Sequence, residues 1–85
     1  MNIYEAIEKT EKLLNDNNIY AEVDQFETLP VIVVDIRWGD WKHEHLRSRY
    51  LIEEEAKIGK YVKSEVTEED GSDCYSAKAY YILCA

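Results

Sequence analysis

The feature that most constrains the fold of this chain is a hydrophobic periodicity that changes in the order helix, strand, strand, and then repeats. Apolar residues first recur every three or four positions, as on one face of a helix, and Asn2 and Glu5 have the spacing of a capping box at its start. Two segments of alternating apolar and polar residues follow, which is the pattern of strands. In all, six elements are expected, in residues 3–14, 19–26, 31–38, 40–57, 60–67 and 74–84.

This αββαββ order is compatible with two simple sheet topologies. A circular permutation of the ferredoxin-like fold gives the strand order 3-4-2-1, which places the two most apolar strands in the centre and the two charged strands at the edges. A meander in the order 1-2-3-4 would bury the charged third strand. We therefore expect an α+β fold with a four-stranded antiparallel sheet and two helices on one face, in a single compact domain over residues 1–85.

The composition is strongly acidic, with 18 Asp and Glu residues against 10 Lys and Arg residues and a formal net charge of −8. Such a surface repels nucleic acid and anionic membranes, and it attracts a basic surface on another protein. The sequence has neither a stretch that could cross a membrane nor the apolar segment of a signal peptide at its start. Cys74 and Cys84 lie at opposite ends of one expected strand, too far apart for an intrachain disulfide. These features predict a cytoplasmic protein.

Residue types that could support catalysis are present, but their spacing does not favour it. His43 and His45 are two positions apart and would lie on nearly opposite sides of a helix, which disfavours a shared metal ion. Cys74 could act as a nucleophile with His45 as its base, but acidic neighbours raise the pKa of a thiol. Residues 68–73 are acidic like a calcium-binding loop but lack its spacing. We therefore expect a non-enzymatic protein without a metal or other cofactor.

Two acidic runs are the leading candidates for binding a partner protein. One lies near the end of the expected second helix and the other follows the third strand, and we expect them to come close together if that helix leads directly into that strand. Closely spaced carboxylates on a rigid scaffold can imitate the phosphates of a nucleic acid and so occupy a basic surface. The alternative is a solvated face that only aids solubility. The candidate partner-binding residues are Glu53, Glu54, Glu55, Glu68, Glu69, Asp70 and Asp73.

The face of the sheet that lacks helices is a second candidate surface. Apolar side chains there would be framed by charged ones (Glu22, Asp35, Arg37, Lys63 and Lys78), which is typical of protein interfaces. This pattern is compatible with a homodimer through this face or through an edge strand, and the alternative is an ordinary hydrophobic patch partly covered by long side chains. The candidate dimer residues are Val31, Val33, Tyr80 and Ile82.

A short basic segment offers an alternative function, the binding of nucleic acid. Arginines interleaved with aromatic residues can stack on unpaired bases. Against a net charge of −8 this partner is the less favoured one, and we expect the arginines to pair with acids of the next strand while the tryptophans anchor the second helix to the sheet. The residues concerned are Arg37, Trp38, Trp41, Arg47 and Arg49.

Two segments, WGDWKHEHLR (Trp38–Arg47) and EVTEEDGSDCYSA (Glu65–Ala77), resemble short uncharacterised proteins encoded by bacteriophages and prophages. In size, acidity and expected fold the chain is also similar to phage anti-CRISPR proteins, many of which occupy a nucleic-acid groove of their target. That similarity is one of style and transfers no site residue. It implies an inhibitor or regulator of a host protein, such as a CRISPR-type protein that handles nucleic acid.

Overall fold

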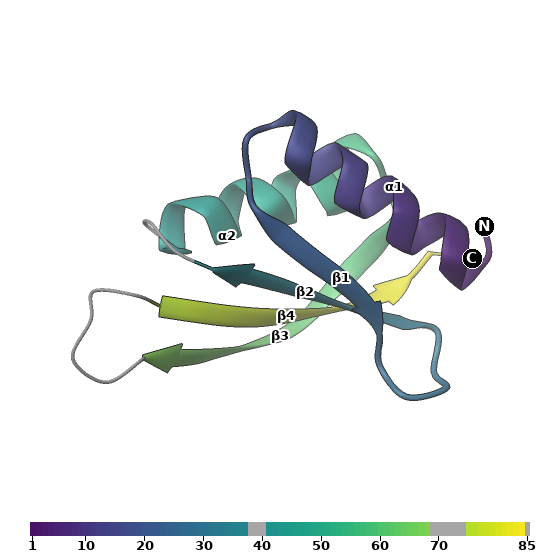
Figure 1. The fold of residues 1–85 in the computed structure, drawn as a ribbon. Coiled ribbons are helices and arrows are strands. Elements are labelled where there is room, and N and C mark those ends of the chain that lie inside the picture. Colours follow the sequence, from purple (N-terminus) through teal and green to yellow (C-terminus); the bar gives the residue numbers. More distant parts are fainter. Residues whose placement is uncertain (38–40, 69–74, 85) are drawn as a thin grey trace.

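The computed structural model describes residues 1–37, 41–68 and 75–84, with the backbone alone at Trp41, Glu68 and Tyr75. Its elements follow the expected αββαββ order, with one additional π-helical turn, η1, at the end of the second helix (Figure 1). The elements are α1 (Ile3–Asp16), β1 (Ala21–Gln25), β2 (Val31–Arg37), α2 (Trp41–Tyr50), η1 (Leu51–Glu55), β3 (Gly59–Glu68) and β4 (Tyr75–Leu83).

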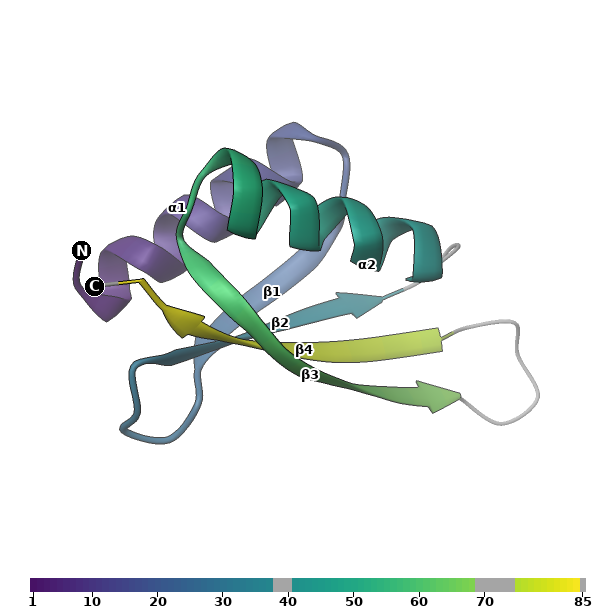
Figure 2. The ribbon, with the colours of Figure 1, turned by 180° about the vertical axis from the view of Figure 1, so that it is seen from behind.

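The four strands form one antiparallel sheet in the order β1-β2-β4-β3, which is the predicted order 3-4-2-1 read from the other edge. The apolar strands β2 and β4 are central and the charged strands β1 and β3 are at the edges, so the meander is excluded. Both helices lie on one face of this sheet, and the views from front and back agree that the other face carries none (Figures 1 and 2).

The core lies between the helices and the sheet. From α1 the buried residues are Ala6, Thr10 and Leu14, spaced four apart along one helical face. From the sheet come the alternate residues of β2 and β4, which pair in register as Ile32 with Tyr81, Val34 with Ala79, and Ile36 with Ala77. The two alanines leave room for the helices to approach the sheet closely, as their positions in the sequence predict.

The first helix begins and ends as its sequence predicts. The Asn2 side chain accepts a hydrogen bond from the backbone N–H of Glu5 at 2.8 Å, which is the N-cap bond of a capping box. The second bond joins the two side chains, because the Asn2 amide donates to the Glu5 carboxylate at 3.3 Å. At the other end Asn18 takes the left-handed conformation with a φ of 61°. Asparagine tolerates this conformation better than most residues, and it turns the chain toward β1.

The second helix differs from the expectation of one continuous helix over residues 40–57. It changes to π-helical hydrogen bonding over Leu51–Glu55, where the N–H of Ala56 donates to the carbonyl of Leu51. Lys57, with a φ of 52°, ends it in the left-handed conformation. Gly59 was expected to be that stop but is instead the first residue of β3. The cap assigned to Asp40 lies outside the described residues.

Gly59 is required by its neighbour across the sheet rather than by its own dihedral angles. A Cβ at this position would come within 2.8 Å of the backbone carbonyl oxygen of Ile82, closer than real Cβ atoms approach. The residue therefore allows β3 and β4 to start pairing directly after the helix.

Candidate functional site

Glu53, Glu54 and Glu55 do not lie close to Glu68, which is the one member of the second acidic run that the structure describes. Glu53, Glu54 and Glu55 lie in η1, before β3, whereas Glu68 is the last residue of β3. An extended strand rises about 3.3 Å per residue, so β3 separates the two groups by roughly 30 Å. The path is visible in Figure 1, where β3 runs from the end of η1 to the opposite end of the sheet. Glu69, Asp70 and Asp73 lie outside the described residues.

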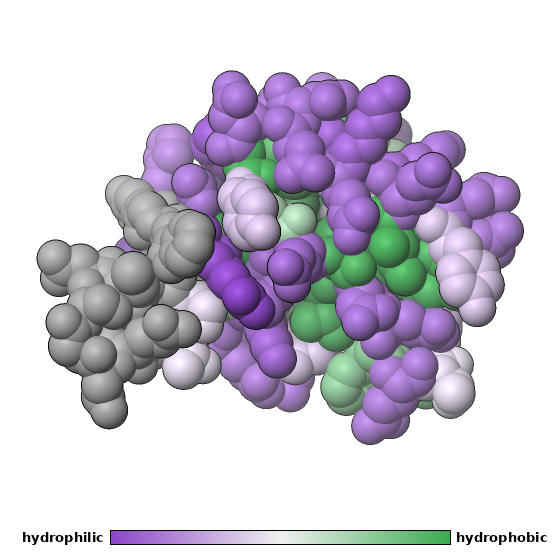
Figure 3. Space-filling model, in the orientation of Figure 1, coloured by the Kyte–Doolittle hydropathy of each residue, from purple (hydrophilic) through white to green (hydrophobic). Residues whose placement is uncertain are grey.

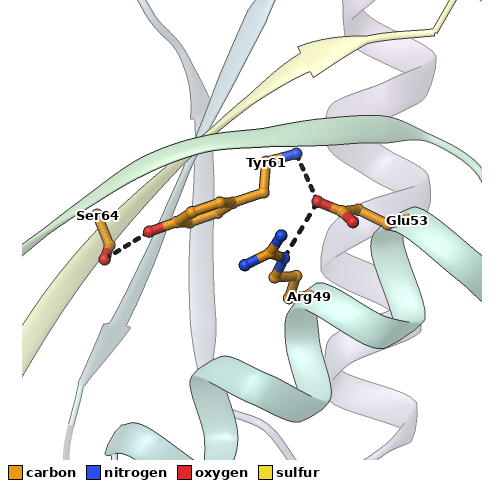
Figure 4. Close-up of polar contacts among 4 residues, drawn as sticks. All are labelled: Arg49, Glu53, Tyr61 and Ser64. Atoms are coloured by element: carbon orange, nitrogen blue, oxygen red, sulfur yellow. Dashed lines mark hydrogen bonds and ion pairs between the residues drawn. The ribbon is translucent and has the colours of Figure 1, made fainter.

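Glu53 holds the helix end against the sheet and is not free to contact a partner (Figure 4). Its Oε1 atom accepts a hydrogen bond from the backbone N–H of Tyr61 at 2.6 Å and one from Nε of Arg49 at 3.3 Å. The guanidinium of Arg49 also stacks over the Tyr61 ring, 4.4 Å from its centroid. The Tyr61 hydroxyl and the Ser64 hydroxyl lie 2.8 Å apart, at hydrogen-bonding distance.

His45 packs beside this network, with its ring centroid 5.4 Å from that of Tyr61. Burial disfavours the charged imidazolium and the positive charge of Arg49 adds to this, so the pKa of His45 is lowered from its ordinary value. Tyr81, which is fully buried, lies next to Tyr61 with ring centroids 5.8 Å apart. Burial also raises the pKa of Tyr81, and the nearby Glu53 carboxylate adds to that effect.

Glu54 and Glu55 are exposed, and neither has a hydrogen bond or ion pair to another described residue. Their surroundings are of mixed charge. Glu54 lines a shallow hollow of about 410 Å³ together with Lys57 and Lys60. These two lysines offset much of the negative charge at this end of β3.

The three described arginines of the basic segment are all engaged within the chain. Arg37 lies 3.7 Å from Asp35 and 4.0 Å from Glu22, and Arg49 pairs with Glu53. Nη2 of Arg47 donates to the carbonyl oxygen of Asn17 at 2.8 Å, which ties α2 to the end of α1. The expected partners were acids of the next strand, but these partners come from β1, β2, η1 and the end of α1. Trp38 and the side chain of Trp41 lie outside the described residues.

The open face of the sheet brings its predicted apolar residues together. Val31 pairs in register with Ile82 and Val33 with Tyr80, so the four side chains share one face of the two central strands. Ile82 is 50% exposed although it lies in a central strand. The ring of Phe26 meets that of Tyr80 edge to face at 5.2 Å and extends the patch. Phe26 was missed in the sequence, although its alternation with Glu22 and Asp24 placed it on this face.

The charged residues around this patch are divided by sign. The acidic residues lie toward the β1 edge and line a hollow of about 550 Å³ with Phe26, Val33 and Tyr80; they are Glu22, Asp24 and Asp35. The basic residues lie toward the β3 edge and pair in register with Ile82, Tyr80 and Asp35; they are Lys60, Lys63 and Lys78. Glu65 and Arg37 are the exceptions, and each forms an ion pair with a neighbour of opposite charge.

The side of the molecule on which α1 and β1 face the viewer has a different character. Hydrophilic side chains cover most of its described surface, and hydrophobic surface is seen beside α1 and β1 and in the lower part of the view (Figure 3). The edge strand β1 is protected there, because the Glu11 carboxylate of α1 accepts a hydrogen bond from the backbone N–H of Val23 at 3.2 Å.

The remaining candidates for chemistry are not assembled into a site in the described ranges. His43 is exposed on α2 and His45 is half-buried. In residues 1–37, 41–68 and 75–84 no group of three or more His, Cys, Asp or Glu side chains is placed to hold a metal ion. Cys84 is a free, exposed thiol, and Cys74 lies outside these ranges. No helix in the described part of the chain is both long and apolar enough to span a membrane.

Comparison of the chain with models of protein families, with curated proteins and with solved structures finds no match.

Proposed function

We propose that this protein is a non-enzymatic binding module that occupies a basic surface of a partner protein and thereby inhibits or regulates it. The observation that carries this proposal is that the described arginines of the basic segment contact acceptors within the chain. Arg37 and Arg49 form ion pairs with carboxylates of the chain itself, so two of the three charges are offset within the fold. Arg47 donates to a backbone carbonyl, which holds its side chain in place. A chain with a net charge of −8 then presents a surface on which carboxylates dominate.

The acids between β3 and β4 are the ones we assign to the partner. Residues 68–73 hold Glu68, Glu69, Asp70 and Asp73 and no basic residue. Glu54 and Glu55, by contrast, lie near Lys57 and Lys60, and Glu53 is used inside the fold. We therefore assign the partner contact to residues 68–73, whose sequence holds four acidic residues and no basic one.

The resemblance to phage-encoded proteins indicates the class of partner. A host protein that handles nucleic acid has a basic groove shaped for phosphates, and a set of carboxylates on a compact domain can fill that groove. Much of the association would then depend on charge, so it should weaken as salt screens the contact.

The experiment is an affinity capture of the tagged protein from nuclease-treated host lysate, with elution by increasing salt and identification by mass spectrometry. The proposal predicts one stoichiometric basic protein that elutes at raised salt. Capture of nucleic acid in a lysate without nuclease treatment, with loss of the signal in an R47E variant, would instead support the nucleic-acid alternative. A captured protein that high salt does not release would contradict the electrostatic contact.

A further inference from the structure

The open sheet face is an apolar patch that no described helix covers (Figures 1 and 2), although Nζ of Lys63 lies over the Tyr80 ring, 5.1 Å from its centroid. Val31, Val33, Tyr80 and Ile82 lie side by side on β2 and β4, and Phe26 extends them toward β1. Soluble proteins rarely leave such a patch bare in the middle of a sheet face, and a polar rim around it is typical of protein interfaces. The charges around the patch identify what covers it.

These charges run across the face in rows fixed by the strand register. One row reads Asp24, Val33, Tyr80 and Lys63 from β1 to β3. The next row reads Glu22, Asp35, Lys78 and Glu65. In both rows the residue on β1 is acidic. The lysine lies on β3 in the first row and on β4 in the second.

We infer that this face packs against the same face of a second copy, related by a two-fold axis that runs parallel to the strands. Such an axis places β1 of each copy over β3 of the other, and β2 over β4, which brings opposite charges together on both sides of an apolar centre. The strands of packed sheets cross at about 30°, so contacts near the axis are closest to direct superposition. Four facing pairs result between the copies: Val31 with Ile82, Val33 with Tyr80, Asp24 with Lys63, and Asp35 with Lys78.

Asp35 gives independent support for a cation from outside the chain. Its side chain is only 16% exposed, and its Oδ1 atom is buried without a hydrogen-bond partner among the described residues. Buried carboxylate oxygens normally have a partner. Asp35 lines the hollow of about 550 Å³ together with Lys78 of its own chain, and in this arrangement Lys78 of the second copy faces Asp35 from outside.

One facing pair in the second row is electrostatically unfavourable. Glu22 of each copy faces Glu65 of the other, but Glu22 is 4.0 Å from Arg37 and Glu65 is 3.2 Å from Lys63 in their own chain. These neighbouring cations offset the repulsion. A rotation about an axis across the strands would instead place β1 over β1 and set Asp24 against its own copy, so the charges favour the axis along the strands.

The size of the face sets the strength of the dimer. Four strands about 4.8 Å apart and rows spanning about six residues make a face of roughly 20 Å by 20 Å. Two such faces have a combined projected area of roughly 800 Å², which is below the roughly 1,200–2,000 Å² of stable specific interfaces and in the range of weak, transient ones. We therefore expect a dimer that dissociates on dilution. This inference does not rest on the acidic contact proposed above, because it uses none of residues 53–55 or 68–73.

The test is sedimentation velocity of the full chain across the micromolar concentration range, for the wild type and a charge-swap series. The wild type should change from monomer to dimer as concentration rises. D24K and K63D should each weaken the dimer by about tenfold or more, because each places like charges together twice per dimer. The double variant D24K/K63D should recover most of the wild-type affinity.

I82K provides a second route that does not depend on charge pairing. It should abolish the dimer by placing an ammonium group in the apolar centre, whereas L46K, the same change at an exposed apolar residue of α2, should leave the dimer unchanged. Circular dichroism and thermal melting check that each variant is folded. A wild type that remains monomeric at the highest concentration, a dimer insensitive to I82K, or a double swap that restores nothing would overturn the inference. If the protein captured from lysate is lost with I82K while the wild type is monomeric, the face belongs to that partner instead.

Discussion

The Glu53 carboxylate accepts the backbone N–H of Tyr61 at 2.6 Å, and this contact joins the π-helical turn to an edge strand. It lies next to an irregularity in β3, where the register with β4 shifts between Tyr61 and Lys63. Arg49 donates to the same carboxylate oxygen at 3.3 Å. The end of the second helix and the bulge in β3 are therefore held in place by one side chain.

Removing this carboxylate should destabilise the fold. We expect E53A to lower the free energy of unfolding by about 2 kcal/mol, because it leaves the Tyr61 N–H and Arg49 without their acceptor. E53Q keeps an acceptor oxygen, so its free energy of unfolding should fall by less than that of E53A. Urea denaturation measures both, with E54A as the control at an exposed neighbour. Equal stability of E53A and E54A would show that the contact is not stabilising.

Stability should fall on the acid side of neutrality through His45. Its pKa in the folded state is lowered below the ordinary 6.5 by burial and by Arg49, so the unfolded chain binds this proton first. The contribution of neutral His45 is therefore present above pH 6.5 and is lost as the pH falls through the folded-state pKa. We expect the free energy of unfolding to fall between about pH 7.5 and about pH 5.5, and to fall by less in H45Q than in the wild type. Denaturation at the two pH values measures both changes. A loss in H45Q identical to that of the wild type would contradict this account.

Gly59 should not tolerate even a methyl group. A Cβ at this position meets the backbone oxygen of Ile82 at 2.8 Å, and backbone cannot move aside as a flexible side chain can. We expect G59A to cost about 1–3 kcal/mol in the free energy of unfolding. K60A, at the exposed next residue, is the control. A G59A variant as stable as K60A would show that β3 and β4 can separate locally at no cost.

The hydroxyl of Tyr81 is predicted to contribute nothing to stability. It is buried without a hydrogen-bond partner among the described residues, so removing it also removes the cost of burying it. Y81F should be as stable as the wild type or more stable by up to about 1 kcal/mol, whereas Y81A should lose about 3–5 kcal/mol by leaving a cavity. Thermal denaturation distinguishes these outcomes. A Y81F variant that loses more than about 1 kcal/mol would reveal a hydrogen bond to that hydroxyl.

The order of elements and the sheet order could be predicted because each rests on a local pattern. Alternation in residues 19–26 and 60–67 with charges on one side marks edge strands, and the apolar strands 31–38 and 74–84 can only be central. The same alternation placed Val31, Val33, Tyr80 and Ile82 on one face, and the register confirms it. Period-two patterns determine faces directly, so these predictions needed no tertiary information.

Other features depend on tertiary contacts that the sequence does not encode locally. Glu53, Glu54 and Glu55 are identical in type and adjacent, and only the path of β3 past η1 makes the first of them structural. The π-helical turn has no residue signature, and it accompanies the contacts of Glu53 with Tyr61 and of Ile58 N–H with the carbonyl of Ile52. The separation of residues 53–55 from Glu68 follows from the direction of β3, which periodicity alone does not determine.

The most direct test of the central claim measures the affinity of the captured partner for two variants with the same change in net charge. E68K/E69K reverses charge at the last residue of β3 and at the residue that follows it, and E54K/E55K reverses charge in η1, before the start of β3. The account predicts that E68K/E69K weakens binding by at least about tenfold, in line with like-charge contacts at an interface, while E54K/E55K stays close to the wild type. Equal affinities of E68K/E69K and the wild type would contradict the claim that these acids bind the partner.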